Sequence, residues 1–309
     1  MEEAIFSIGG MDLNSKSLLY FSENSRLVFL SDEQVDKVNR FRKVVEKVLL
    51  SNESHYGINT GFGFLAEVKI SKKDLVDLQY NLVRSHACGV GEFLSDDMSR
   101  SLLLLRAHTL AKGNSGISVG CIKKIIELLK KNCLPCIPVQ GSVGASGDLA
   151  PLAHLAQVLI GEGEVSLDGK KVSTSYAFKR MEIEPYKLSE KEGLSLINGT
   201  CFMANTGTHA VQQANGILFF ANKISALSLI ATRAQTSAFS KDIHLCRNHL
   251  GQIKIAEHIR DILDIGVDES SPWEPLRVQD PYSFRCIAQV HGASFEVIDH
   301  ARKVIDREL

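Results

Sequence analysis

One long apolar segment constrains the fold of this chain more than any other feature. Residues 206–237 are rich in Ala, Leu and Ile, contain few charged residues and have helical spacing. A helix that is apolar on most of its faces has to be covered by other protein surface. In a chain of 309 residues, long enough for two ordinary domains, this segment predicts either the centre of a helical bundle or a subunit interface.

The rest of the chain also has mostly helical spacing, except near its beginning. The apolar run Leu27–Leu30 predicts a short strand, and Ser31-Asp-Glu-Gln34 resembles a capping box that opens a helix to about Ser51. A hairpin is expected over Glu164–Val172, because Leu167-Asp168-Gly169 is a typical turn sequence. Further helices are expected over 72–86, 95–112, 118–132, 148–161, 206–237, 250–264 and 284–309.

These patterns together predict a mainly α protein. We expect a small mixed N-terminal domain containing α and β elements over residues 1–112, followed by a central domain over 113–309 that is a bundle of long helices. The last predicted helix reaches Leu309 without a capping residue or a closing glycine. We therefore expect the bundle to be truncated, that is, incomplete at its C-terminus.

Charge and cysteine content narrow the class of protein. The formal net charge is −1, from 35 basic and 36 acidic residues, so neither nucleic acid nor an anionic membrane is an expected partner. We find no signal peptide and expect no apolar run to span a bilayer. Seven scattered cysteines, an odd number, indicate a reducing cytoplasm. Cys133-Leu-Pro-Cys136 lacks a second pair at zinc spacing, so we interpret it as structural and predict no metal site.

The stretch Gly141–Ala150, GSVGASGDLA, can carry unusual chemistry. If the backbone is bent tightly, the amide nitrogen of Gly147 can attack the carbonyl carbon of Ala145, and loss of one water closes a five-membered imidazolone ring. Loss of a second water from Ser146 leaves an exocyclic alkene, which is an electrophile. Glycine supplies a nitrogen with little steric cover and the required backbone freedom. Asp148 is expected to cap the helix that follows.

Other glycine-loop interpretations fit less well. A phosphate-binding loop would end in Gly-Lys-Ser/Thr, whereas this one runs into Asp148 and Leu149. The pattern G-x-S-x-G is missed because Asp148 replaces the last glycine. Gly61-Phe62-Gly63 is not preceded by an apolar strand, so we discount a dinucleotide site. A simple turn, or an anion-binding helix N-terminus, remains the structural alternative.

Four other segments contain polar or aromatic residues with possible functions. They are Tyr56-Gly-Ile-Asn-Thr-Gly-Phe-Gly63, Asn81-Leu-Val-Arg-Ser-His86-Ala-Cys-Gly89, Leu196-Ile-Asn198-Gly-Thr200 and Gln279-Asp-Pro-Tyr282-Ser-Phe-Arg285. Taken singly, each has a structural interpretation: turn tyrosines, a histidine at a helix end, a capping asparagine and a surface arginine.

Together with Gly141–Ala150, these segments closely resemble the aromatic amino-acid ammonia-lyase and aminomutase family, and within it the histidine ammonia-lyases. The resemblance implies that Ala145, Ser146 and Gly147 form the 4-methylideneimidazol-5-one group (MIO) autocatalytically, with no external cofactor and no metal. The substrate would be a small molecule, L-histidine, which loses ammonia without oxidation to give urocanate.

The resemblance also implies roles for individual residues. Tyr56 matches the catalytic base, and Asn198 matches an amide that hydrogen-bonds near the MIO group and the substrate. Tyr282 matches a catalytic tyrosine. His86 would face the substrate ring, Gln279 would line the pocket, and Arg285 would bind the substrate carboxylate.

The resemblance leaves alternatives open. His86 is typical of histidine and tyrosine lyases, so a tyrosine ammonia-lyase or an aminomutase is the second candidate. The residues after His86 and the run Val278–Tyr282 read closer to histidine lyases. A third candidate is a non-catalytic helical scaffold in which Ser146 stays unprocessed. Family members extend past the position of Leu309 and form homotetramers, so this chain itself is expected to lack part of the site.

Overall fold

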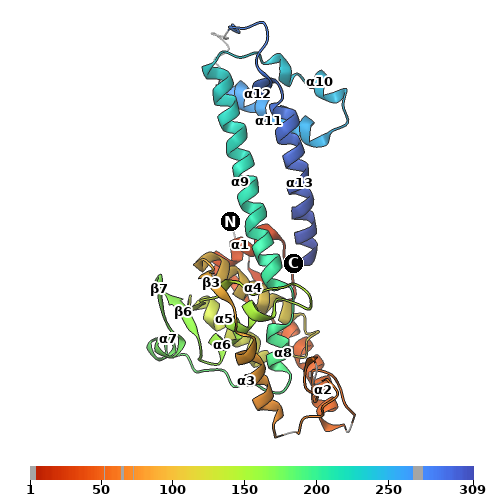
Figure 1. Cartoon of the computed structure of the whole chain (residues 1–309), viewed down its shortest axis with the longest axis vertical. Helices are drawn as coiled ribbons and strands as arrows, with labels where there is room; N and C mark the ends of the chain where they lie inside the picture. Colours follow the sequence, from red (N-terminus) through yellow and green to blue (C-terminus); the bar gives the residue numbers. More distant parts are fainter. Residues whose placement is uncertain (1–4, 52, 64–65, 72, 267–273) are drawn as a thin grey trace. The chain divides into compact units, whose positions relative to one another are not determined.

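The computed structural model describes residues 5–51, 53–63, 66–71, 73–266 and 274–309. The chain forms two compact units, Met1–Gly207 together with Leu309, and Thr208–Glu308. Helix α9 (Cys201–Ala231) contains the boundary between them. Helices dominate both units (Figure 1), which confirms the mainly α prediction.

The first unit contains most of the elements. Its helices are α1 (Ser15–Glu23), α2 (Asp32–Leu50), α3 (Leu75–His86), α4 (Asp96–Ala111), α5 (Val119–Lys130), α6 (Leu149–Leu159), α7 (Thr174–Met181), α8 (Glu192–Ile197) and the start of α9, with a 3-10 turn, η1 (Ser25–Leu27). Among its described residues, the strands form three small sheets: β1 (Phe6–Ser7) parallel to β2 (Val28–Phe29), β3 (Val90–Phe93) antiparallel to β5 (Pro138–Gln140), and the antiparallel order β4 (Leu134–Pro135), β6 (Glu164–Leu167), β7 (Lys170–Ser173).

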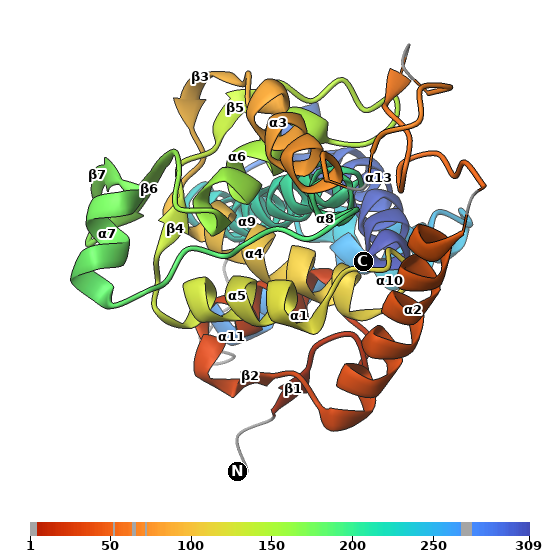
Figure 2. The ribbon, with the colours of Figure 1, turned by 90° about the horizontal axis from the view of Figure 1, so that it is seen from below.

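Helix α4 lies at the centre of the first unit. Its run Leu102–Leu105 is almost completely buried, because α1 and α5 pack against it, as seen from below in Figure 2. Helices α3, α6 and α8 contact one another in the same unit. Burial of apolar area on this scale is the main favourable contribution to folding.

Several local predictions are confirmed. Ser31 caps α2 by accepting a hydrogen bond from the backbone of Gln34, but the reciprocal half of a capping box is missing, because Gln34 Oε1 has no hydrogen-bond partner among the described residues. The predicted hairpin is β6 and β7, and its turn residues Asp168 and Gly169 have φ angles of +52° and +72°, as a two-residue turn with left-handed backbone requires. Helix α3 begins at Leu75; Lys72, its predicted start, lies outside the described residues.

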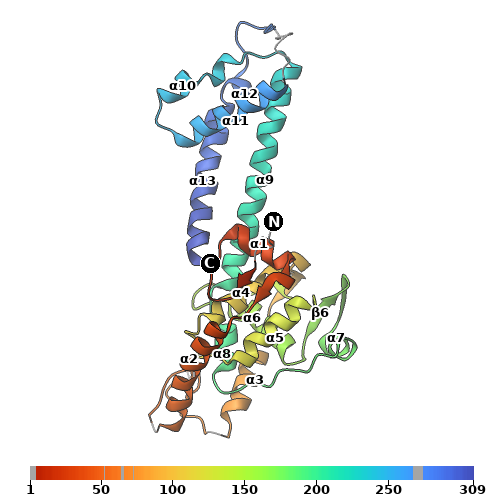
Figure 3. The same ribbon diagram turned by 180° about the vertical axis from the view of Figure 1, so that it is seen from behind.

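The described part of the second unit consists of helices: the rest of α9, α10 (Lys241–Leu245), α11 (Leu250–Gly266), α12 (Tyr282–Arg285) and α13 (Ile287–Glu308), with a 3-10 turn, η3 (Ser237–Phe239). Figure 3 shows α11 beside the beginning of α13. Their backbones cross closely, since a Cβ on Gly292 would lie 2.5 Å from the backbone nitrogen of Gln252. The core residues Leu229, Phe239, Ala256, Ile259 and Ala288 join these helices.

Helix α9 differs from its prediction in two ways. It spans Cys201–Ala231 rather than 206–237, and the described part of the chain leaves one face of it uncovered: Ile217, Phe220 and Leu227 are 63–71% exposed. By length and composition alone, Glu192–Ala231 contains a stretch that is long and apolar enough to cross a membrane. The expectation that no apolar run has this length was therefore wrong, although core helices of soluble proteins pass the same test.

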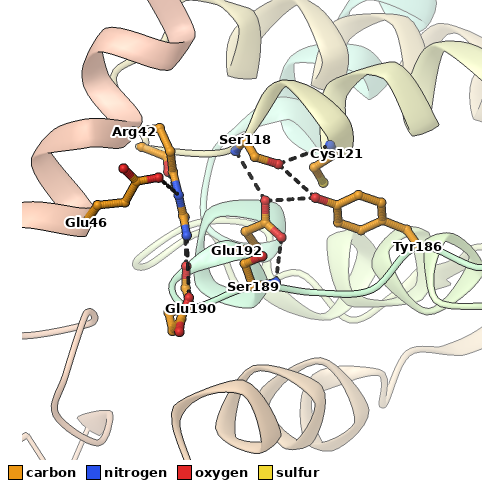
Figure 4. Close-up of polar contacts among 9 residues, drawn as sticks. Arg42, Glu46, Ser118, Cys121, Tyr186, Ser189, Glu190 and Glu192 are labelled. Atoms are coloured by element: carbon orange, nitrogen blue, oxygen red, sulfur yellow. Dashed lines mark hydrogen bonds and ion pairs between the residues drawn. The ribbon is translucent and has the colours of Figure 1, made fainter. Parts of the chain in front are cut away.

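A buried carboxylate fixes the beginning of α8 (Figure 4). Glu192 is fully buried and accepts hydrogen bonds from the backbone nitrogens of Ser118 (3.2 Å) and Ser189 (2.7 Å) and from the Tyr186 hydroxyl (3.1 Å). Burial and this carboxylate raise the pKa of Tyr186 well above its usual value. Because all three donors satisfy one carboxylate, α8 is tied to the start of α5.

The buried side chain of His108 in α4 is expected to make the folded chain less stable in acid. His108 is completely buried, and its Nδ1 accepts a hydrogen bond from the backbone of Gly9 (3.1 Å). Burial, assisted by Lys112, lowers the pKa of His108 from 6.5 to about 4. The unfolded chain therefore binds this proton first as the pH falls, so stability decreases from pH 6.5 toward 4, by about 3 kcal/mol in total.

The measurement for His108 is urea unfolding at a series of pH values. His108→Asn keeps an acceptor for Gly9 but does not titrate. The changed packing should lower the free energy of unfolding of this variant by the same amount at each pH. The fall in that free energy between pH 6.5 and 4 should be smaller than in the original chain by about 3 kcal/mol. A variant whose pH dependence matched that of the original chain would contradict this assignment.

Candidate active site

The loop between β5 and α6 contains the Ala145-Ser146-Gly147 triplet. Ala145 and Ser146 are exposed, whereas Gly147 and Asp148 are buried. Gly144 has a φ angle of +62° and Gly147 one of +128°, a region that favours glycine. The loop is thus sharply bent on both sides of Ser146.

Gly147 is pressed against the segment that follows α8. A Cβ at this position would lie 2.7 Å from the backbone nitrogen of Gly199 and 2.8 Å from the Asn198 side-chain oxygen. The backbone nitrogen of Asp148 donates to the Gly199 carbonyl at 2.7 Å. No side chain fits at residue 147, so the structure brings Asn198 and the triplet together in a compressed arrangement.

Asp148 has a different role from the one predicted. Its side chain makes no capping hydrogen bond to α6. Instead, the fully buried carboxylate accepts from the Ser142 hydroxyl (2.5 Å) and from the backbone nitrogen of Met203 (3.0 Å) in the first turn of α9. It therefore caps α9, not α6, because that first turn lies beside the loop and offers unpaired amide groups.

His86 is the last residue of α3 and is half-buried. Its Nδ1 lies 2.9 Å from the Leu82 carbonyl oxygen, which can only accept, so Nδ1 carries the proton and Nε2 is an acceptor in the neutral ring. The segment after His86 reaches the triplet loop: β3 pairs with β5, and a Cβ on Gly141 would lie 3.2 Å from the Cα of Gly89.

Tyr56 lies in a loop that rests on α8. A Cβ on the next residue, Gly57, would lie 2.6 Å from a methyl carbon of Leu194. The Tyr56 ring packs edge-on against Phe62, with a centroid distance of 6.2 Å, and its hydroxyl accepts from the backbone of Gly63. Tyr56 is nevertheless 62% exposed, so its phenol is accessible and not a packed core side chain.

The remaining predicted residues form their own cluster in the second unit. With its amide oxygen toward the guanidinium, Gln279 accepts from Arg285 at 2.9 and 3.0 Å. Arg285 also donates from Nε to the Asp280 carbonyl and lies over the Tyr282 ring, 4.5 Å from its centroid. The guanidinium fork is thus oriented by a ring, an amide and a backbone oxygen.

The predicted site residues therefore fall into two groups. Tyr56, His86, the triplet and Asn198 belong to the first unit, and the Gln279–Arg285 cluster belongs to the second. Sequence reasoning did not single out Arg106, which is 1% exposed and hydrogen-bonded to the Asn198 carbonyl. The sequence could have indicated it, because Arg106 follows four leucines in a helical segment, LLLLRA, and a charged side chain at a buried position needs polar partners.

The two thiols of the Cys133-Leu-Pro-Cys136 sequence do not have the character of reactive cysteines. Burial raises the pKa of both Cys133 and Cys136 to about 11. Within the described residues, no three His, Cys, Asp or Glu side chains gather as a metal site would require.

The bent triplet loop on a helical scaffold agrees with the family that the sequence resembles, and the chain belongs to the aromatic amino acid lyase family. The profile of that family, "Aromatic amino acid lyase", matches residues 13–309. The chain is 44% identical over 294 residues to a protein from Geobacillus sp. (strain WCH70) described as histidine ammonia-lyase, covering 95% of this chain and 57% of that relative.

Solved structures agree with this assignment. The crystal structure of histidine ammonia-lyase from Trypanosoma cruzi is similar with a TM-score of 0.84 and 36% identity, covering 97% of this chain and 56% of that one. Tyrosine aminomutase from Streptomyces globisporus is similar with a TM-score of 0.86 and 33% identity, covering 98% and 61%. The chain thus spans somewhat more than half of the length of its relatives.

Proposed function

We propose that the protein is a histidine ammonia-lyase, which eliminates ammonia from L-histidine to give urocanate and uses an electrophile made from Ala145, Ser146 and Gly147. The observation that carries the proposal is the compression of Gly147 against Asn198 and Gly199. A tight bend at this residue is what ring closure onto the Ala145 carbonyl requires. The curated relatives with this description support the choice of reaction.

The residues around the triplet fit the MIO group. Ser146 is exposed, so the alkene formed from its Cα and Cβ would be open to a substrate, while Gly147 is fixed by contacts with Asn198 and Gly199. Once formed, the MIO group supplies an electrophile that engages the substrate amine and improves it as a leaving group. Asn198 would direct its amide toward the same place, where it can donate or accept a hydrogen bond.

His86 is the proposed contact for the substrate ring. Since its Nδ1 proton is committed to the Leu82 carbonyl, Nε2 of the neutral ring can accept a hydrogen bond from the N–H of an imidazole substrate. A phenolic substrate could donate its O–H to the same atom, so this contact favours a polar ring without separating histidine from tyrosine.

Tyr56 is the proposed base that removes a β-proton from the substrate. Its phenol is exposed and supported by Phe62 and by the backbone of Gly63. General bases need reach and a fixed direction more than burial, and the loop supplies both through its contact with Leu194.

Arg285, with Gln279 and Tyr282, is the proposed carboxylate-binding group. A guanidinium that is oriented by an amide, a ring and a backbone oxygen can offer its remaining donors to a carboxylate in a fixed geometry. Tyr282 is 73% exposed, so its hydroxyl is available to a substrate bound beside Arg285.

The whole protein is proposed to be a cytoplasmic homotetramer. The exposed apolar residues of α9, including Ile217 and Phe220, are suited to an interface between subunits. All seven cysteines are free, which is typical of a reducing compartment.

A tyrosine aminomutase or lyase is the second candidate, because structures of that kind share the fold at 33% identity and His86 accepts from either ring. A non-catalytic scaffold would also expose an apolar α9, yet it would have no reason to exclude every side chain at residue 147.

The test has two parts. Intact-mass measurement of the purified chain should give a mass lower by two waters, with the loss mapped to the peptide that contains Ser146. The protein is then incubated with L-histidine and, separately, with L-tyrosine, and the ultraviolet absorbance of urocanate or coumarate is followed. A full-mass chain would contradict the electrophile, and consumption of tyrosine but not histidine would select the second candidate.

A further inference from the structure

Arg106 is a buried cation at the centre of the first unit. It lies in α4, is 1% exposed, and is the largest of the fully buried side chains. A buried charge is costly unless several polar atoms surround it. Nη2 donates to the carbonyls of Ser195 and Asn198, the latter at 3.0 Å, and Nη1 to the sulfur of Cys201 at 3.4 Å.

These partners lie within residues 195–201, which include the end of α8, the residues that join it to α9, and the first residue of α9. The carbonyl oxygens at the C-terminal end of a helix carry partial negative charge. The carbonyls at the end of α8 therefore interact favourably with the guanidinium, and these hydrogen bonds hold residues 195–201 against α4. Unlike a surface ion pair, this contact is shielded from solvent and salt.

The same segment supports the triplet loop on its other side. A Cβ on Gly199 would lie 2.5 Å from Nη1 of Arg106, and a Cβ on Gly147 would lie 2.7 Å from the backbone nitrogen of Gly199. The Gly199 carbonyl accepts from the backbone of Asp148. The backbone of Gly199 thus lies between the Arg106 guanidinium and Gly147, whose nitrogen attacks in ring closure.

We propose that Arg106 is a positioning residue for formation of the electrophile: it makes residues 195–201 a rigid support that holds Gly147 close to the Ala145 carbonyl. The inference rests on the proposed function. In ring closure the Gly147 nitrogen bonds to the Ala145 carbonyl carbon. The first water carries that carbonyl oxygen with the amide protons of Ser146 and Gly147, and the second carries the Ser146 hydroxyl with the Ser146 Cα proton. Arg106 takes no part in these proton transfers.

A second buried arginine offers a matched control. Arg42 is 8% exposed and likewise donates to two backbone carbonyls, those of Gly116 (3.2 Å) and Glu190 (2.8 Å). Figure 4 shows it beside Glu190, which precedes α8, whereas Arg106 binds the other end of that helix. Loss of either arginine removes two hydrogen bonds to backbone carbonyls. Loss of Arg42 also removes its ion pairs with Glu46 (3.9 Å) and Glu190 (3.6 Å), so Arg42→Met is at least as large a perturbation as Arg106→Met, whereas Arg106 is the one that backs the triplet loop.

The experiment follows the intact mass of the chain over time after synthesis in a cell-free translation, for the original sequence, Arg106→Met, Arg106→Lys and Arg42→Met, with urea unfolding of each product. We expect the original chain and Arg42→Met to lose two waters at similar rates. Arg106→Lys keeps the positive charge but not the paired guanidinium donors, so it should lose the two waters at least tenfold more slowly. Arg106→Met should remain folded and keep its full mass.

The outcomes separate the inference from the proposed function. A folded Arg106 variant that loses two waters at the original rate would overturn the positioning role. Equal slowing in Arg42→Met and Arg106→Lys would also overturn it, since the effect would then be general destabilisation. If Arg106→Met does not fold, the rate of Arg106→Lys decides. An original chain that never loses water contradicts the proposed function itself.

Discussion

Replacing Ser146 by alanine is expected to leave a folded chain of full mass and to abolish ammonia release. The Ser146 side chain is exposed, so its loss removes little packing. Without the hydroxyl the second water cannot form, and no alkene is made. Turnover of L-histidine should fall on the order of 1,000-fold or more, the scale seen when an enzyme loses the group that forms its covalent intermediate.

The measurement combines intact mass with urocanate absorbance, and Val143→Ala is the control. Val143 is in the same loop and is 86% exposed, so truncating it should leave both the two-water loss and the turnover as they are in the original protein. If Ser146→Ala released urocanate at an undiminished rate, the chemistry would have to reside elsewhere and the proposed mechanism would be wrong.

Regular elements with strong periodicity could be predicted from the sequence, while elements fixed by tertiary contacts could not. The α2 cap at Ser31 and the turn at Asp168-Gly169 are local features, and both are confirmed. The strands β3 and β5 have four and three residues, too few to show a period, although their pairing brings the His86 segment to the triplet loop.

The start of α9 illustrates the limit most directly. Periodicity placed it at residue 206, whereas the helix begins at Cys201 because Asp148, 55 positions away from Met203 in the sequence, caps its first turn. The same long-range contact removes Asp148 from its expected role at α6. Local propensity favoured capping of the adjacent helix, but the loop is bent so that the carboxylate faces the other one.

In the candidate site, too, features within one segment could be predicted from the sequence, whereas contacts between distant segments could not. Ring closure within Ala145-Ser146-Gly147 could be inferred from residue types alone, and the resemblance supplied Tyr56, His86, Asn198 and the Gln279–Arg285 cluster. Compression of Gly147 by Gly199 could not be inferred, since it joins residues 52 positions apart through backbone contacts that leave no pattern in the sequence. The support from Arg106 depends on a third element, α4.

Replacing Tyr56 by phenylalanine should separate turnover from formation of the electrophile. The change removes one hydroxyl from a ring that is 62% exposed and keeps the ring's edge contact with Phe62. Residue 147 contacts Asn198 and Gly199, which Tyr56 does not hold, so the variant should still lose two waters. Without a base for the β-proton, the rate of ammonia release should fall by about 100- to 10,000-fold.

Tyr176→Phe is the matched control, because Tyr176 in α7 is a similarly exposed tyrosine of the same unit, at 56%. It should keep both the mass loss and the rate. A Tyr56→Phe protein that keeps its full mass would mean that Tyr56 acts in ring closure, not in turnover. A rate within a few-fold of the original would reassign the base to another residue, and Tyr282, the other proposed catalytic tyrosine, would be the first to replace. The pair Ser146→Ala and Tyr56→Phe thus tests the electrophile and the base independently, because only the first should change the mass.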